Sequence, residues 1–437
     1  YNMNALFLTL TSLVALAIAD ADAVGRNADS PCGDAQTDNA SADNKKAANV
    51  TADDSRCGAA GIPPVPSIDP AHIPYIAALA GRQRMENLVY TGLLRAGISE
   101  DTEGMKPLLR AAFGNALQCE RQNADFDRIS AAFQQAGVDH LPLKGLASRE
   151  LYQSIDMRSL SDLDILIRRE QLEKACETMT SLGYRAGKVS KYEHVFENGG
   201  AAVELHTALL SPENRDFYPY FGDGWGRAKQ RDGHLWRYSR EDELVYSFVH
   251  FTKHYRNGGA GIKFVVDIEE YIRRVPGLDM EYVRGELESL GLVSFFENAL
   301  RLCRAWFEGG EHDDVTRLMT DCICRGGVFG TRDSEISARI ARTADGDMRG
   351  ASRKRMWQTL FPSLDSMKEI YPFLARAPFL LPAGYAARAF RLLLFRRDRI
   401  GRLISDTKSA STDSAQHFVD ELHAVGLDIC RIDDSDM

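Results

Sequence analysis

The sequence predicts an α+β protein in which a small sheet-containing core lies between two helical regions. Residues 162–167 alternate polar and apolar side chains, as a half-buried strand does. An Asn-Gly-Gly link at 198–200 joins two more strand-like segments, 192–197 and 201–206, and such a link is a strong hairpin signal. On both sides of this stretch apolar residues recur at helical spacing.

Length and composition exclude several classes of protein. The chain has 437 residues, of which 44% are hydrophobic and 26% charged, so collagen-like, wholly disordered and multi-span membrane proteins are excluded. Its length allows two to three domains and a core large enough to need no disulfide or metal. The net charge of -9 does not favour nucleic acid or an anionic membrane as a partner of the whole molecule.

The eight cysteines form no CxxC pair and no zinc-spaced cluster with histidine. We therefore expect free thiols in a reducing compartment, with a Cys32–Cys57 bridge as the alternative if the protein is exported. The apolar run 5–19 has signal-peptide length and is followed by small residues, but no Lys or Arg precedes it. Leu6, Leu10 and Leu13 recur at helical spacing, so a buried helix fits the same run.

The remaining elements follow in chain order. Segment 25–61 has no Leu, Ile, Phe, Tyr or Trp, a composition too polar to offset the entropy of ordering. Three helices are predicted next, over 73–94, 105–117 and 126–136, and then a strand over 140–145 that ends in a glycine turn, a helix over 146–154 and another over 170–182. Beyond residue 242 the pattern is mostly helical. The predicted divisions are an apolar helix or signal-like segment (1–24), a disordered linker (25–61), a helical region (62–137), the α/β core (138–235), a C-terminal helical domain (236–410), and a last helix with an acidic tail (411–437).

Acidic residues on two of the predicted strands suggest a metal site. Asp162 and Asp164 are two residues apart, so both side chains project from one face of their strand. Glu204 and His206 share a face of the later strand in the same way, which brings a third carboxylate beside the first two if the strands are neighbours. Carboxylate oxygens with room for water suit Mg²⁺. The alternative is that all three acids are solvated strand residues.

Two basic residues flank these acids. Lys144 and Gly145 stand where a strand passes into a helix, a place where backbone N–H groups and the helix dipole favour a phosphate. Arg158, just before the acidic strand, offers a forked contact to a phosphate oxygen. Read singly, each is an ordinary surface residue. Together they favour a phosphate-bearing substrate.

Short motifs along the chain resemble the uncharacterised nucleotidyltransferase family of the polymerase-beta-like superfold. The resemblance extends over about residues 73–402. It is carried by Leu-Lys-Gly-Leu-Ala at 143–147, Leu-Tyr at 151–152, Arg-Ser-Leu-Ser-Asp-Leu-Asp-Ile-Leu-Ile at 158–167, Val-Glu-Leu-His at 203–206, His-Phe-Thr-Lys-His-Tyr at 250–255, Gly-Gly-Ala-Gly-Ile-Lys at 258–263, Asp-Ile at 267–268, Leu-Phe-Pro at 360–362, Tyr-Pro at 371–372 and Leu-Leu-Pro at 380–382.

The resemblance implies a mixed β-sheet flanked by helices and a metal-dependent transfer of a nucleoside monophosphate from a nucleoside triphosphate to a hydroxyl acceptor. It implies Asp162, Asp164 and Glu204 as catalytic ligands of Mg²⁺ or Mn²⁺, with Glu204 also placed to take a proton. The superfold's phosphate-binding turn usually shows a Gly-Ser pair, whereas this chain has Lys-Gly-Leu-Ala-Ser at 144–148. The residues we expect to contact the nucleotide or its phosphates are Lys144, Gly145, Ser148, Arg158, His206, Lys253 and His254.

Alternatives and partners remain open at this stage. The same fold serves equally as a catalytically silent nucleotide- or protein-binding module, or as a phosphotransferase using the same metal site. The acceptor is an unidentified small molecule or protein, and no specific nucleic-acid binding is expected. His250 and His254 are spaced to share a metal or to pack near the cleft, and the glycines at 258–261 form a phosphate cradle or a simple turn.

The arginine-rich helix Arg388–Arg402 suits weak contact with a membrane surface or an acidic partner. We expect the protein in the cytoplasm, where nucleoside triphosphates are supplied. Export through the signal-like N terminus is the alternative.

Overall fold

We describe the chain from a computed structural model. It describes residues 3–19, 67–200, 202–210, 216–328, 330–344, parts of 349–395, and 412–429. The predicted linker at 25–61, Cys32, Cys57 and the acidic end of the tail lie outside the described residues. The described cysteines are free thiols, and none of the described helices is both long and apolar enough to cross a membrane.

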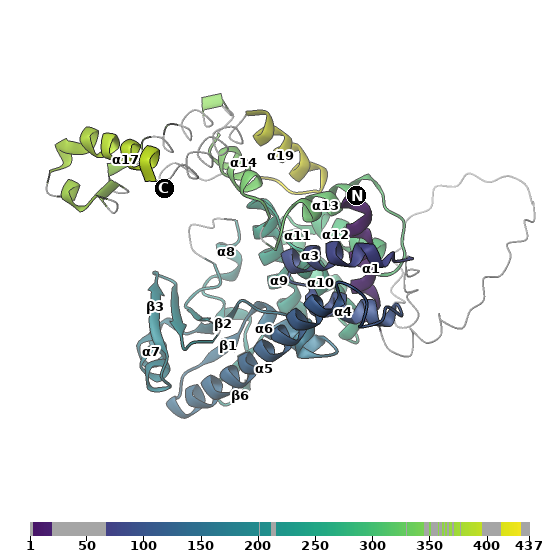
Figure 1. The fold of residues 1–437 in the computed structure, drawn as a ribbon. Coiled ribbons are helices and arrows are strands. Elements are labelled where there is room, and N and C mark those ends of the chain that lie inside the picture. The colour runs from purple at the N-terminus through teal and green to yellow at the C-terminus, as the bar shows by residue number, and fades with distance from the viewer. Residues whose placement is uncertain are drawn as a thin grey trace, which may run out of the picture.

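One mixed sheet lies at one side of the molecule, and most helices lie at the other (Figure 1). Its strand order is β3-β4-β5-β2-β1-β7-β6, with β2 parallel to β5 and β1 parallel to β7. The other neighbours are antiparallel, including the predicted hairpin β4–β5. The strands are β1 (His140–Pro142), β2 (Asp162–Ile167), β3 (Arg185–Val189), β4 (Glu193–Glu197), β5 (Ala202–His206), β6 (Lys229–Asp232) and β7 (Leu235–Arg237).

The two faces of the sheet differ in chemistry. Leu163 and Ile165 of β2, with Val203 and Leu205 of β5, turn to one face and join a buried apolar cluster there. That cluster includes residues of the long helix α5 (Met105–Ala136) and of α7 (Leu172–Ser181), which cover this face. Because side chains alternate along a strand, the polar residues of β2 and β5 face the opposite way.

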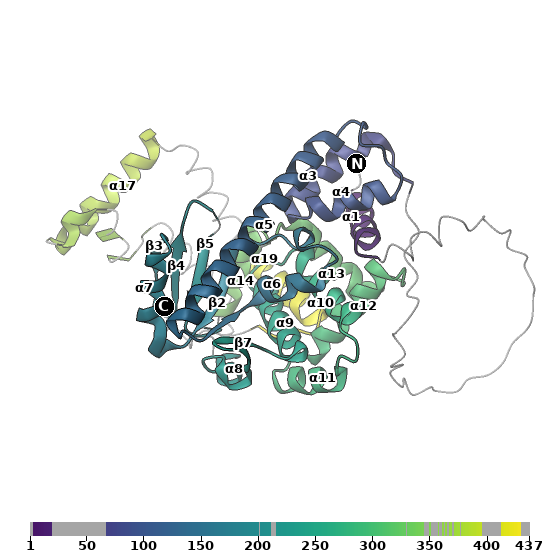
Figure 2. The same ribbon diagram turned by 90° about the horizontal axis from the view of Figure 1, so that it is seen from below.

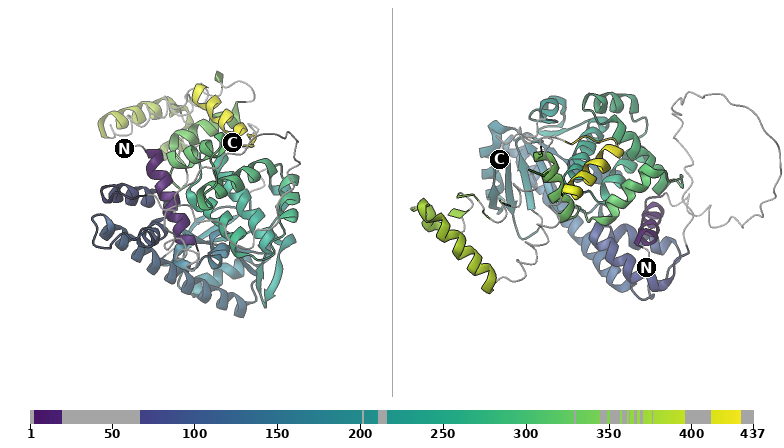
Figure 3. Two further views of the ribbon diagram at one scale, coloured as in Figure 1. Left: turned by 90° about the vertical axis from the view of Figure 1, so that its right-hand side faces the viewer. Right: turned by 90° about the horizontal axis from the view of Figure 1, so that it is seen from above.

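The N-terminal helices are α1 (Met3–Ile18), α3 (Ile73–Gln83), α4 (Glu86–Arg95) and α5. The helix α5 runs from this group to the sheet (Figure 2). The apolar run 5–19 is therefore a core helix in the structure, with Leu10 and Leu13 fully buried. Figure 3 shows α1, in purple, between the other N-terminal helices and the C-terminal ones.

The C-terminal end of α1 is held by side chains from other segments. The last carbonyl groups of a helix have no partner within it, and leaving them buried and unpaired costs free energy. Arg95 donates to the carbonyl oxygens of residues 16, 17 and 19 at 2.8 Å each. Gln153 donates to those of residues 18 and 19, and Arg274 donates to that of residue 18. Polar side chains from three other segments therefore cap this end of α1.

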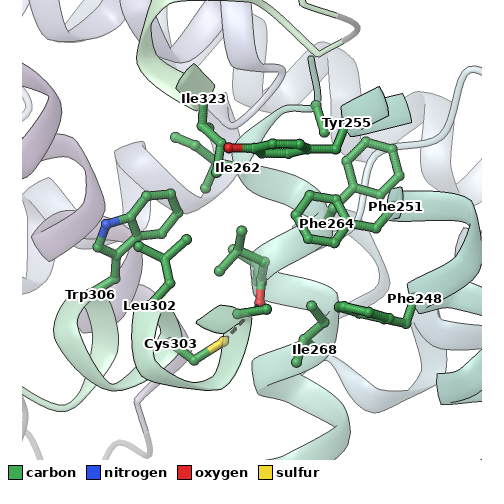
Figure 4. Packing of buried hydrophobic residues seen from close by; sticks show 14 of the residues in the cluster. Phe248, Phe251, Tyr255, Ile262, Phe264, Ile268, Leu302, Cys303, Trp306 and Ile323 are labelled. Carbon is green, nitrogen blue, oxygen red and sulfur yellow. Dashed lines mark hydrogen bonds between the residues drawn. The ribbon is translucent and has the colours of Figure 1, made fainter. Parts of the chain in front are cut away.

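A second apolar core joins the C-terminal helices. Phe251 and Phe264 stack with ring centroids 5.7 Å apart, and Trp306 lies across the same core (Figure 4). This packing sets how α9 and α10 face the sheet. The helices of this part are α8 (Tyr218–Phe221), α9 (Arg240–Arg256), α10 (Ile262–Arg274), α11 (Met280–Ser289), α12 (Val293–Phe307), α13 (Asp314–Arg325), α14 (Arg332–Thr343), α17 (Leu381–Phe395) and α19 (Thr412–Ala424).

The structure corrects several predicted boundaries. The helix predicted over 73–94 breaks at Arg84, which takes a left-handed φ of 53° and ends α3. The helices predicted over 105–117 and 126–136 are one helix, because the polar stretch between them contains no Gly or Pro to stop it. Strands β3, β6 and β7 were not predicted, and the residues of β3 and β6 are all exposed, so they show no alternating pattern.

Candidate active site on the polar face of the sheet

Strands β2 and β5 bring four polar side chains together on one face of the sheet. The strands are parallel neighbours, and Asp164 lies directly opposite Glu204. Asp162 precedes Asp164 by two residues and His206 follows Glu204 by two, so all four project from the same side. The structure thus brings together the three acids that the sequence suggested.

Asp164 is the centre of this group. Its Oδ1 accepts hydrogen bonds from Lys144 Nζ at 2.5 Å and from His206 Nε2 at 2.8 Å. His206 Nε2 also lies 3.5 Å from Glu204 Oε2. Ligand atoms of Asp164, Glu204 and His206 all lie within 4.8 Å of one another, so this group is close enough to share one cation. His206, predicted at the phosphates, stands among the acids instead.

Lys144 reaches Asp164 from the first residue of the helix α6 (Lys144–Ser148). The glycine turn was predicted at Gly145, but the left-handed residue is Lys144, with φ of 52°. Gly145 is required for a different reason, because a Cβ atom there would lie 2.4 Å from Leu160 and 3.0 Å from Arg158. The helix predicted over 146–154 is also shorter, and passes into a 3₁₀ turn at Arg149–Leu151.

The charges on this face are unequal. Burial alone would raise the pKa of Asp164, but the Lys144 charge and the His206 hydrogen bond outweigh it and hold that pKa well below its usual value. The pKa of Lys144 is correspondingly raised, since the Asp164 charge outweighs the effect of burial. Burial, then the charges of Asp164 and Glu204, raise the pKa of Asp162 to about 6. Asp162 has no hydrogen bond or ion pair with any residue that the structure describes.

A pocket of about 270 Å³ opens beside these acids. The sheet side of its lining includes Asp162, Asp164 and Lys144. The opposite side is formed by α9 and α10 and carries two lysines and two histidines. It includes His250, Lys253, His254, Lys263 and Asp267. The pocket therefore has two aspartates and Lys144 on its sheet wall, and two lysines, two histidines and Asp267 on its helix wall.

The family assignment agrees with this geometry. The model of the uncharacterised nucleotidyltransferase family matches residues 69–308, more than half of the chain. The chain belongs to the uncharacterised nucleotidyltransferase family. This confirms the resemblance seen in the sequence motifs, and the α+β fold class is confirmed as well.

Comparison with other proteins adds little beyond the family. The chain is similar to a solved structure, the solution structure of the antibiotic-resistance factor ANT(2'')-Ia, at 16% identity and a TM-score of 0.30. The match covers 39% of this chain and 91% of that one. A likeness this weak carries no argument about the substrate of this family member. No curated protein matches the chain.

The α9 side of the pocket carries a pair of neutral imidazoles. His250 and His254 lie with their Nε2 atoms 3.2 Å apart, as the i,i+4 spacing allows. Burial lowers the pKa of His254 to about 3 and that of His250 well below its usual value, so neither is charged at neutral pH. Among the described residues no third ligand completes a metal site with this pair. Both residues line the pocket as a hydrogen-bonded pair of neutral rings.

Two lysines, Lys253 and Lys263, lie on the same side of the pocket as these histidines. Burial, then the Lys144 charge, lowers the pKa of Lys253. Burial, then the Arg158 charge, lowers the pKa of Lys263 to about 7. An ammonium group that is short of water and crowded by like charge is stabilised by an anion, so this family member presents a wall suited to phosphate. The sequence singled out Lys253 but not Lys263, although Lys263 belongs to a motif that carried the resemblance.

Arg158 and Ser148 are engaged by a residue that the sequence patterns did not single out. Arg158 binds Asp267 of α10 through two hydrogen bonds of 2.7 Å, and Tyr152 donates to the same carboxylate at 2.7 Å. Ser148 donates to Asp267 at 3.3 Å. Arg158 and Ser148 were predicted at the phosphates, but here they join the core to the helical region at the edge of the pocket. In the sequence Asp267 stood out only within the Asp-Ile motif at 267–268, and no role was assigned to it.

The glycine run at 258–261 packs against another loop. A Cβ atom at Gly259 would lie 2.7 Å from Gly330, and one at Gly261 would lie 2.8 Å from Val328. Gly258 and Gly259 also take positive φ angles of 121° and 131°. The run is thus a tight packing contact, which agrees with the turn rather than the phosphate cradle.

Proposed function

We propose that the chain is a divalent-metal-dependent nucleotidyltransferase that moves a nucleoside monophosphate from a nucleoside triphosphate to a hydroxyl acceptor. The observation that carries this proposal is the pairing of Asp164 with Glu204 on neighbouring parallel strands, with Asp162 on the same face. Three carboxylates this close repel one another unless a cation lies among them. Lys144 pairs with Asp164 and His206 lies against both Asp164 and Glu204, so Asp162 is the carboxylate without a partner among the described residues.

The donor set fits a hard cation. Mg²⁺ and Mn²⁺ prefer oxygen ligands from a few carboxylates, with water and substrate phosphates completing the shell. Asp162, Asp164 and Glu204 are the residues that would hold the ion. When bound, such an ion stabilises charge on the phosphate oxygens during transfer. The raised pKa of Asp162, caused by burial and then by its acidic neighbours, supports a site that binds a positive charge.

The basic groups around the pocket suit the triphosphate. Lys144 stands between the acids and the pocket, and its ammonium group is placed to neutralise phosphate charge. Lys253 and His254 approach from the opposite wall. Gly145 and Arg158 also line the pocket, although Arg158 is bound to Asp267. Ser148 and His206 are outside its lining and bond to Asp267 and Asp164.

In this scheme Glu204 accepts the proton of the attacking hydroxyl group. The acceptor oxygen bonds to the α-phosphorus, the bond from that phosphorus to the bridging oxygen breaks, and pyrophosphate leaves with the electron pair. The hydroxyl proton passes to Glu204, and His206 positions this carboxylate by lying between it and Asp164.

The proposal is tested by product analysis and by calorimetric titration with each nucleoside triphosphate and Mg²⁺. We expect Asp162→Asn to reduce binding and to lower pyrophosphate release by about 10²-fold or more, since charge stabilisation at the phosphates is lost. Asp125→Asn, at an acid of α5 that pairs with Arg128 and does not line the pocket, is the matched control and should be active. Release of a nucleoside diphosphate instead would indicate a phosphotransferase. Binding without turnover of any tested acceptor would favour the silent binding module.

A further inference from the structure

One segment of the chain is strongly basic although the whole protein is acidic. Residues 349–402 contain twelve Lys and Arg but only three Asp and Glu, while the full chain has a net charge of -9. The segment thus carries a local charge of the opposite sign to the rest of the molecule. A charge separation of this kind orients a protein towards an anionic surface and keeps its remaining surface away from it.

The same segment exposes aromatic side chains. Of the seven Phe, Tyr and Trp residues with highly exposed side chains among the described residues, five lie here. Phe379 is 80% exposed and Phe390 is 64% exposed. The five, which we call the aromatic surface, are Trp357, Phe361, Phe373, Phe379 and Phe390. A gathering of large exposed apolar groups usually marks an interaction site.

The position of α17 makes this surface accessible. The helix stands away from the sheet and from the other helices in Figures 1 and 2 and in the right-hand view of Figure 3. Trp357 and Phe361 stack at 5.0 Å, and Phe361 meets Tyr385 of α17 at 5.3 Å, so the rings are ordered relative to this helix. Phe379 and Leu380 lie at its start between two prolines, where the chain turns.

We propose that the aromatic surface docks on an anionic lipid bilayer, with the Phe side chains entering the interfacial region and the net positive charge of segment 349–402 attracted by the headgroups. Exposed apolar groups and local positive charge are the two contributions that hold interfacial segments on membranes. The exposed Leu380 beside Phe379 favours lipid over nucleic acid, because an aliphatic side chain can enter a bilayer but offers no ring for base stacking. The surface is separate from the pocket, and this proposal does not depend on the proposed function.

The test is sedimentation of the full chain with vesicles, either of phosphatidylcholine alone or of phosphatidylcholine mixed with phosphatidylglycerol. We expect binding to the anionic vesicles that weakens as salt rises, because the headgroup attraction is screened. Phe379→Ser with Phe390→Ser should weaken vesicle binding by about tenfold or more, since two exposed rings no longer enter the interface.

The matched control is Phe113→Ser. Phe113 is 70% exposed on α5, outside the aromatic surface, so its loss should leave vesicle binding unchanged. Thermal unfolding of each variant checks that it is folded. Equal binding to both kinds of vesicle, no binding to either, or binding of a single-stranded RNA probe without vesicle binding would each overturn the proposal. The salt dependence of the unmodified chain tests it without any variant.

Discussion

The two walls of the pocket each contain a buried aspartate, and the two aspartates have opposite surroundings. Asp267, on the helix wall, receives two hydrogen bonds from Arg158, one from Tyr152 and one from Ser148. Asp164, on the sheet wall, receives hydrogen bonds from Lys144 and His206 but stands among other acids. The first carboxylate is saturated by protein donors, whereas the second belongs to a group with more negative than positive charge.

This difference separates a carboxylate that stabilises the fold from one that is suited to binding a cation. A carboxylate whose lone pairs are all used by protein donors has no capacity left for a ligand, so Asp267 is suited to joining two parts of the fold. A cluster with surplus carboxylates is costly for folding and is stabilised when a cation binds. Residues of the same type on facing walls therefore serve different ends, and their partners, more than their burial, distinguish them.

The sharpest way to test this contrast is to make the same substitution on both walls. Asp267→Asn leaves the Arg158 guanidinium buried without its ionic partner, and we expect the free energy of unfolding to fall by about 3–5 kcal/mol. Asp162→Asn removes a charge that burial and the neighbouring acids disfavour, so we expect that free energy to rise by about 1–3 kcal/mol at neutral pH. Urea unfolding without divalent cations measures both.

Opposite signs in that experiment would support the contrast. If Asp162→Asn destabilises the chain as much as Asp267→Asn does, Asp162 has a structural partner and repulsion among the carboxylates of the sheet wall does not destabilise the fold. Asp125→Asn, which removes a partly buried carboxylate paired with Arg128 on α5, serves as the control for the loss of an ordinary ion-paired acid.

A second buried acid of α10 extends the comparison to the pH dependence of stability. Glu270 of α10 is buried beside Arg274, and burial raises its pKa to about 7 despite that arginine. Between about pH 4.5 and pH 7 the folded state holds this proton and the unfolded state releases it, so stability falls as the pH rises. We expect Glu270→Gln to remove about 2–3 kcal/mol of that fall, measured by urea unfolding across this range.

The control for this pH effect is Glu335→Gln. Glu335 pairs with Arg339 on the surface of α14, with both side chains about half exposed, and such pairs contribute little. Its variant should follow the pH profile of the unmodified chain. A Glu270→Gln profile that also matches would show that Glu270 ionises in the folded state as it does in the unfolded one.

The side-chain positions on the sheet wall could be predicted from the sequence, whereas the contacts on the helix wall largely could not. Successive side chains of a strand point to opposite faces of the sheet. A spacing of two residues therefore assigned each of the four polar side chains to one face: Asp162, Asp164, Glu204 and His206. That the two strands are neighbours was only a condition in the sequence analysis, and the structure supplies it through the parallel pairing of β2 with β5. The confirmed parts of the fold, the strand 162–167 and the hairpin that follows it, are those with such local signals.

Contacts between distant segments gave no such signal. Asp267 lies more than a hundred residues beyond Arg158, and nothing near it in the chain marks it as a partner. The same holds for Lys263, whose place in the pocket depends on how α10 packs on α9. The exposed strands β3 and β6 lack an apolar face, so they depend on pairing with a neighbour rather than on a pattern of their own.

The smallest expected effect concerns the neutral donors of Asp267. Tyr152→Phe removes one hydrogen bond of 2.7 Å but leaves the Arg158 pair intact, so we expect a loss of about 1 kcal/mol in urea unfolding. Ser148→Ala removes a longer bond, 3.3 Å, and should cost less than Tyr152→Phe. If either loss approaches that of Asp267→Asn, the carboxylate depends on all its donors together, and the helix wall is one cooperative network rather than an ion pair with neutral support.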